Sequence, residues 1–98
     1  MDDFDYFTTA FDSLMVNIYA PWCNHCKDFA PIYDEAGQRL FDSMPRYFLA
    51  KIDGSKYPEL KNRFEIPGFP TLYHFKRGRP TKYDGIRSVK GVVDYVKK

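Results

Sequence analysis

The chain has little cysteine, no long apolar run and no segment that looks like a targeting signal. Its two cysteines among 98 residues could form one bridge, too few for a disulfide-rich framework. No stretch approaches the roughly 18 consecutive apolar residues of a membrane span, so we expect no direct membrane contact. The start lacks the basic and apolar regions of a signal peptide, and the end lacks a retention signal. A processed or excised domain would look the same, so these absences leave the compartment open.

What the chain does contain is enough apolar material for one core. Hydrophobic residues make up 44% of the sequence and aromatic residues 18%, and the length allows one domain. The net charge is +2, but residues 1–50 carry three basic and eight acidic side chains, whereas residues 51–98 carry twelve and five. The basic residues of the second half are scattered, so we interpret them as solvated surface and expect no nucleic-acid partner.

The apolar pattern predicts helices and strands in alternation. The predicted helices cover residues 4–13, 23–41, 57–64 and 89–96. The predicted strands cover residues 14–20, 47–52, 71–75 and 81–83. We expect the first two strands to be buried and to pair in parallel, and the turn at residues 77–80 to join the last two as a hairpin. This order predicts an α/β domain with a mixed sheet.

The two cysteines stand three residues apart at the start of the first long helix. Cys23 and Cys26 would lie about one helical turn apart, close enough for a disulfide. The ring closed by that bond is small and stabilises the fold little, so reversible thiol–disulfide exchange is the better interpretation. A Cys-x-x-Cys between a strand and its helix is typical of a thioredoxin-like redox site. An inert disulfide and half of a zinc site stay open, although zinc prefers four ligands and the chain has only two separated histidines to add.

Residues 19–27 read Tyr-Ala-Pro-Trp-Cys-Asn-His-Cys-Lys. This run closely resembles the active-site segment of protein disulfide isomerase domains, which usually reads Tyr-Ala-Pro-Trp-Cys-Gly-His-Cys-Lys. Residues 51–53, 68–71 and 83–87 resemble the family's second central strand, its cis-proline loop and the segment that carries its mobile arginine. The resemblance covers nearly the whole chain, and four motifs in the right order are far more specific than the cysteine pair alone.

The resemblance implies the thioredoxin fold, with a central mixed sheet and helices on both faces. The family's first strand is expected to be absent, because too few residues precede Phe4 to supply it. We expect residues 1–98 to form a single thioredoxin-like domain, which would be one domain of a longer native chain.

The same resemblance assigns roles around the cysteine pair. Cys23 is the exposed nucleophile and Cys26 the more buried resolving thiol. His25 adds a stabilising charge or a hydrogen-bond donor, and Asn24 stands where the family usually has glycine. Arg87 matches an arginine that can swing towards the resolving cysteine and lower its pKa. The alternatives are that His25 is merely an exposed polar residue and that Arg87 is a solvent-facing arginine.

Three further residues are expected to form the substrate-binding surface. By resemblance, Trp22 and Phe69 lie beside the redox pair as an apolar shelf, and Pro70 is the cis proline. In the family this loop lends backbone groups to the substrate strand, a form of β-addition. The alternatives are that Trp22 and Phe69 are ordinary core aromatics and that Pro70 is a trans proline in a plain turn.

One position departs from the family in a way that affects the mechanism. Asn17 stands where the family usually has a buried glutamate that shuttles the proton of the resolving cysteine, and a neutral amide cannot accept that proton. Lys51 matches the lysine that pairs with the acid. Either Asn17 is a satisfied buried amide and Lys51 reaches water, or Lys51 lacks its counter-ion and favours a thiolate nearby. We predict slower resolution than in a typical member, and faster turnover for Asn17→Glu.

The resemblance therefore predicts a thiol–disulfide oxidoreductase of the protein disulfide isomerase type. It would form, reduce or rearrange disulfides in unfolded or misfolded proteins, and the resemblance implies the lumen of the endoplasmic reticulum. No metal or organic cofactor is implied, because glutathione or a partner oxidase supplies the redox equivalents. Two alternatives stay open: a thioredoxin-like reductase, disfavoured because that family has proline where this chain has His25, and a chaperone or adaptor module with weak turnover, which Asn17 favours.

Overall fold

The computed structural model describes the backbone of residues 2–98 and the side chains of residues 4–98. Its helices are α1 (Asp2–Ala10), α2 (Asn24–Phe41), α3 (Glu59–Arg63) and α4 (Val89–Lys97). Its strands are β1 (Ser13–Tyr19), β2 (Phe48–Asp53), β3 (Thr71–Lys76) and β4 (Arg79–Lys82). The predicted order of elements is confirmed. The first helix ends at Ala10, earlier than predicted, because the chain has already entered β1 by Ser13.

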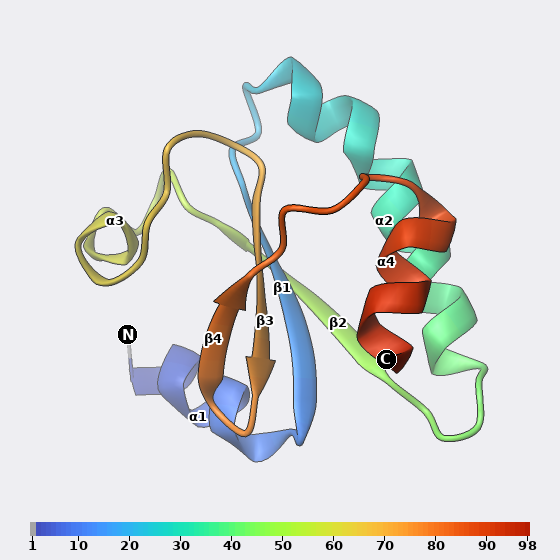
Figure 1. Cartoon of the computed structure of the whole chain (residues 1–98). Coiled ribbons are helices and arrows are strands. Elements are labelled where there is room, and N and C mark those ends of the chain that lie inside the picture. Colours follow the sequence, from blue (N-terminus) through green and yellow to red (C-terminus); the bar gives the residue numbers. More distant parts are fainter. Residues whose placement is uncertain (1) are drawn as a thin grey trace.

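The four strands form one mixed sheet in the order β2-β1-β3-β4. Strand β1 pairs in parallel with β2 and antiparallel with β3, and β3 pairs antiparallel with β4. Helices α2 and α4 cover one face of the sheet, and α1 and α3 cover the other (Figure 1). Within residues 2–98 no strand precedes α1, which agrees with the expected absence of the family's first strand.

The central strand β1 divides the core into two clusters. Its side chains alternate between the faces of the sheet. Leu14, Val16 and Ile18 pack on the side of α1 and α3, whereas Met15 packs on the side of α2 and α4. By the same alternation Asn17 lies on the α2 side, and it is only 4% exposed. A polar side chain is thus placed in the layer between the sheet and α2.

The prediction that the second strand is buried is wrong. Every residue of β2 is exposed or half-buried, because β2 is an edge strand and only β1 pairs with it. Phe48 is 38% exposed and rests against the rings of Phe11 and Phe41. An apolar run in the sequence does not distinguish an edge strand from an interior one, since both present apolar side chains to a covering helix.

The predicted hairpin is confirmed, and its turn is formed by two residues. Arg77 and Gly78 have φ values of 52° and 84°, which is the left-handed backbone of the turns that join antiparallel strands most tightly. A β-carbon on Gly78 would also lie 2.8 Å from the methyl carbon of Thr9 in α1. Glycine therefore satisfies both the turn and the close approach of α1.

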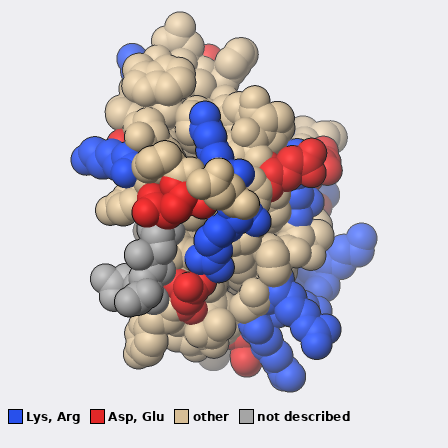
Figure 2. Space-filling model, turned by 90° about the vertical axis from the view of Figure 1, so that its left-hand side faces the viewer, with Lys and Arg blue, Asp and Glu red and all other residues tan. Residues whose placement is uncertain are grey.

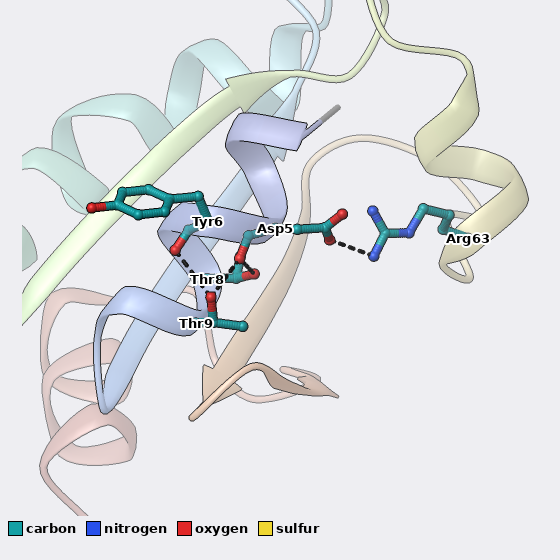
Figure 3. A network of polar contacts seen from close by, with 5 residues as sticks. All are labelled: Asp5, Tyr6, Thr8, Thr9 and Arg63. Atoms are coloured by element: carbon teal, nitrogen blue, oxygen red, sulfur yellow. Dashed lines mark hydrogen bonds and ion pairs between the residues drawn. The ribbon is translucent and has the colours of Figure 1, made fainter.

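The short helix α3 is tied to α1 by a polar contact and held mainly by apolar packing. The guanidinium of Arg63 donates to Asp5 at 2.7 Å (Figure 3). Both side chains are well exposed, so this ion pair contributes no more than about 1 kcal/mol. Leu60 is fully buried, and Phe64 packs on Phe4 and Phe75. This packing fixes the loop that leads from α3 to residues 67–70.

Charged side chains of both signs lie on the face of the molecule shown in Figure 2. Figure 2 shows the side formed by α1, α3 and the β3–β4 hairpin, where Lys and Arg side chains project in several directions among Asp and Glu side chains. This distribution agrees with the interpretation of the basic residues as solvated surface. None of the helices described in residues 2–98 is long and apolar enough to cross a membrane.

Candidate active site

Cys23 occupies the position just before the first residue of α2. Its backbone is extended, with φ −87° and ψ 122°, and its Sγ accepts a hydrogen bond from the backbone N–H of Cys26 at 3.4 Å. The first N–H groups of a helix have no intrahelical partners and carry partial positive charge. The sequence therefore places Cys23, as predicted, where a thiolate is stabilised by the backbone.

The surroundings of Cys23 favour its ionised form. The pKa of Cys23 is lowered chiefly by the hydrogen bond with the Cys26 side chain, then by the backbone N–H groups of Cys26 and His25 and by the positive charge of Arg87, while partial burial opposes these effects. A thiolate is the nucleophile in disulfide exchange. A larger share of Cys23 is therefore thiolate than in an ordinary cysteine at the same pH.

Cys26 lies in the opposite environment. It is buried on the inner side of α2, and burial raises its pKa to about 11, with the hydrogen bond to Cys23 adding to the rise. The two cysteines are thiols in this structure. One is accessible and acidic and the other is buried and protonated, which is the asymmetry that a nucleophile and a resolving thiol require.

The loop before β3 borders Cys23. The Phe69–Pro70 peptide bond is cis, as predicted; the Met44–Pro45 bond is also cis, which was not predicted. The thiol of Cys23 donates to the carbonyl of Phe69 at 3.3 Å. The ring of Trp22 meets the ring of Phe69 edge-on at 5.8 Å and is 67% exposed. The two rings therefore lie in contact beside Cys23, that of Trp22 exposed and that of Phe69 half-buried.

Arg87 is anchored to the same loop. Its guanidinium donates to the carbonyl of Pro70 at 3.0 Å, and its charge lowers the pKa of both cysteines. A groove of about 360 Å³ runs along this loop and is bordered by Pro70, Arg87 and Lys82. Lys82 was not predicted as a site residue.

One small cavity between α2 and the strands β1 and β2 is lined by Asn17, Lys51 and Cys26. Asn17 and Lys51 face each other in the parallel register of β1 and β2. Lys51 is exposed, but the Oδ1 of Asn17 is buried without a hydrogen-bond partner among the described residues. The interpretation of Asn17 as a satisfied amide therefore does not hold for this atom.

The cavity is also lined by residues that were not predicted from the sequence as site residues. Asp34 on α2 lines it together with Tyr33. No clear signal in the sequence indicated Asp34, because eight residues exceed two helical turns by almost a quarter turn and place it off the buried face that carries Cys26. His25 and Asn24 lie exposed at the start of α2, where the sequence placed them. Among the side chains of residues 4–98, no three metal-ligating groups come together.

We expect Arg87→Ala to raise the pKa of Cys26 and to slow its attack about threefold, because an exposed guanidinium acts through a screened charge. Titration of Cys26 by alkylation as a function of pH measures the shift. Arg79→Ala removes an equal charge from the far end of β4 and serves as the control. An unchanged Cys26 titration in Arg87→Ala would remove Arg87 from the mechanism.

The fold and the site together define a class. Cys23 is a thiol of lowered pKa at a helix N-terminus, and Cys26 is its buried partner one turn later. The cis-proline loop lies against Cys23. This arrangement is typical of the redox centre of a thioredoxin domain of the thiol–disulfide oxidoreductase type. The family model for thioredoxin matches residues 2–98. The chain belongs to the thioredoxin family.

Comparison with known proteins confirms the resemblance to protein disulfide isomerase domains. Protein disulfide-isomerase A4 of Mus musculus is 43% identical over 95 residues, 97% of this chain. Protein disulfide-isomerase 1 of Caenorhabditis elegans is 47% identical over 85 residues, 87% of this chain. The chain spans only 15% of the first protein and 18% of the second.

A solved structure agrees with the sequence relatives. The solution structure of the first thioredoxin domain of mouse Protein disulfide-isomerase A4 superposes with a TM-score of 0.88 at 38% identity, covering 98% of this chain and 69% of that one. The described fold is therefore the thioredoxin fold found in this family.

Proposed function

We propose that the chain forms, reduces or rearranges disulfides in unfolded or misfolded proteins, through alternation of Cys23 and Cys26 between dithiol and disulfide. The observation that carries the proposal is the opposed ionisation of the two thiols: the pKa of Cys23 is lowered and that of Cys26 is raised to about 11. Attack by Cys23 on a substrate disulfide gives a mixed disulfide, which Cys26 then resolves.

The surface around Cys23 supports a polypeptide substrate. The exposed ring of Trp22 and the half-buried ring of Phe69 offer apolar area next to the nucleophile, and the groove bordered by Pro70 and Arg87 continues from it. An extended segment beside Phe69 would place a substrate cysteine over Cys23, a form of β-addition. His25 and Asn24 at the rim and Lys51 behind Cys26 complete the proposed site.

The proposed direction is oxidation and isomerisation more than reduction. A stabilised Cys23 thiolate favours the dithiol form, which makes the disulfide a good oxidant. His25 between the cysteines supports this direction over a thioredoxin-like reductase. Glutathione or a partner oxidase would supply the redox equivalents, and the kinship with protein disulfide isomerases supports the lumen of the endoplasmic reticulum. We further propose that residues 1–98 act as one domain of a longer chain.

A second candidate is a substrate-binding module with weak turnover. Asn17 favours it, because no acid stands at this buried position to take the proton of Cys26. In this case the apolar surface of Trp22 and Phe69 would hold unfolded chains without exchanging their disulfides.

Reactivation of a substrate protein with scrambled disulfides separates the two candidates. We expect the chain, in a glutathione buffer, to restore native pairings and activity of that substrate. Suppression of substrate aggregation without any rearrangement of disulfides would contradict the oxidoreductase and support the binding module. The reduced and alkylated chain is the control, because it keeps the surface and loses the thiols.

A further inference from the structure

The cavity behind Cys26 connects the buried thiol to the surface. Its volume is about 90 Å³, and it lies between α2 and the strands β1 and β2. Cys26 and Asn17 form its buried part, and Asp34 and Lys51, which are exposed, form its outer part. A water molecule takes up about 30 Å³ in the liquid, so the cavity has room for several.

Asn17 gives this cavity a polar inner wall. The side chain is 4% exposed, and its Oδ1 has no hydrogen-bond partner among the described residues. Leaving a buried acceptor unpaired costs about 1–3 kcal/mol. Water in the cavity would donate to this oxygen and remove the cost. The orphaned oxygen therefore points to water as the content of the cavity.

Resolution requires that Cys26 lose a proton, and few groups near it can take one. Lys51 is a cation, and the amide of Asn17 does not accept a proton. The hydroxyl of Tyr33 donates to the carbonyls of Met15 and Ala50. Among the described residues that line the cavity, Asp34 carries the one carboxylate. Along α2 its backbone lies about 12 Å from that of Cys26, so water molecules must bridge the two side chains.

We propose that Asp34 accepts the proton of Cys26 through water in this cavity, and so takes over the role that Asn17 cannot perform. The inference rests on the proposed function, since it concerns the second step of the same exchange. Asn17 orients the water through Oδ1, and Lys51 and Asp34 line the exposed outer end of the cavity.

The mixed disulfide joins the Sγ of Cys23 to a substrate sulfur, and the Cys26 proton passes through water to the Asp34 carboxylate. The Sγ of Cys26 then bonds to the Sγ of Cys23, and the bond to the substrate sulfur breaks. The substrate leaves as a thiolate, reduced by two electrons in all, while the two cysteines become a disulfide. Asp34 then releases the proton to solvent.

Rapid mixing of the reduced chain with a chromogenic aromatic disulfide tests this step directly. The first burst of coloured thiolate depends on reagent concentration and reports attack by Cys23. The second does not depend on it and reports resolution by Cys26. We expect Asp34→Asn to leave the first phase unchanged and to slow the second about tenfold, the low end of general-base effects. Asp34→Glu should restore the second phase.

The control is Asp28→Asn, the same change at an exposed position on α2 that does not line the cavity. The sign of the effect separates proton transfer from electrostatics. Loss of a negative charge near Cys26 favours its thiolate and would speed resolution, whereas loss of a proton acceptor slows it. Asn17→Glu should speed the second phase and make the Asp34→Asn change nearly silent.

Two results would overturn the proposal: a second phase in Asp34→Asn equal to that in Asp28→Asn, or a faster one. A chain that shows the first phase but no second phase, even as wild type, would instead overturn the proposed function. If Asn17→Glu fails to fold, the comparison of the three Asp variants decides the question alone.

Discussion

Replacement of Cys23 by serine is expected to lower the rate of disulfide exchange at least about 1,000-fold, as for other active-site nucleophiles. A serine hydroxyl stays protonated at neutral pH, whereas Cys23 has a lowered pKa because Cys26, the start of α2 and Arg87 stabilise its thiolate. The measurement is turnover of a fluorogenic disulfide substrate. The effect is chemical, so the far-UV circular dichroism spectrum of the reduced variant should match that of the reduced wild type.

The pH dependence of the wild type completes this test. Because the pKa of Cys23 is lowered, its alkylation rate should reach a plateau at a lower pH than that of an ordinary cysteine, and should fall as the thiolate is protonated below that pH. Substantial exchange in Cys23→Ser, or alkylation of Cys23 with an ordinary pKa, would contradict its role as the nucleophile.

Replacement of Cys26 by serine is expected to stop turnover after one attack and to lower steady-state exchange at least about 100-fold. Cys23 keeps its helix N-terminus and the cis-proline loop, so the variant still attacks but has no thiol to resolve the product. Mixed disulfides between Cys23 and substrate proteins should accumulate and be visible by non-reducing electrophoresis.

The matched comparison is the double variant of both cysteines, which should trap nothing. The same accumulation in wild type as in Cys26→Ser would show that Cys26 does not resolve the intermediate. No accumulation in Cys26→Ser would show that Cys23 does not attack protein disulfides, and would favour a module that only binds them.

The fold was predictable where local signals and packing agree. The strand β1, the helix α2 behind Pro21 and the hairpin turn at Arg77 and Gly78 each have a clear pattern and lie where expected. The burial of β2 was not predictable, because it depends on whether another strand pairs with its outer edge, and no property of residues 48–53 encodes that neighbour.

The site was predictable in its residues more than in its contacts. The positions of Cys23 at the start of α2 and of Pro70 in a cis bond follow the motifs. The motifs do not predict the unpaired oxygen of Asn17 or the cavity that reaches Asp34. They arise from the register of β1 on β2 and from the packing of α2 over both, which only the folded chain brings together.

The reduction potential of the Cys23–Cys26 pair, measured by equilibration with glutathione buffers, tests the central claim most directly. The stabilised thiolate of Cys23 favours the dithiol form and predicts a potential less negative than that of a reductase, towards the value of about −180 mV of disulfide isomerases. A value near about −270 mV would mark a reductase and contradict the proposed direction of exchange. No measurable exchange with glutathione would contradict the oxidoreductase itself.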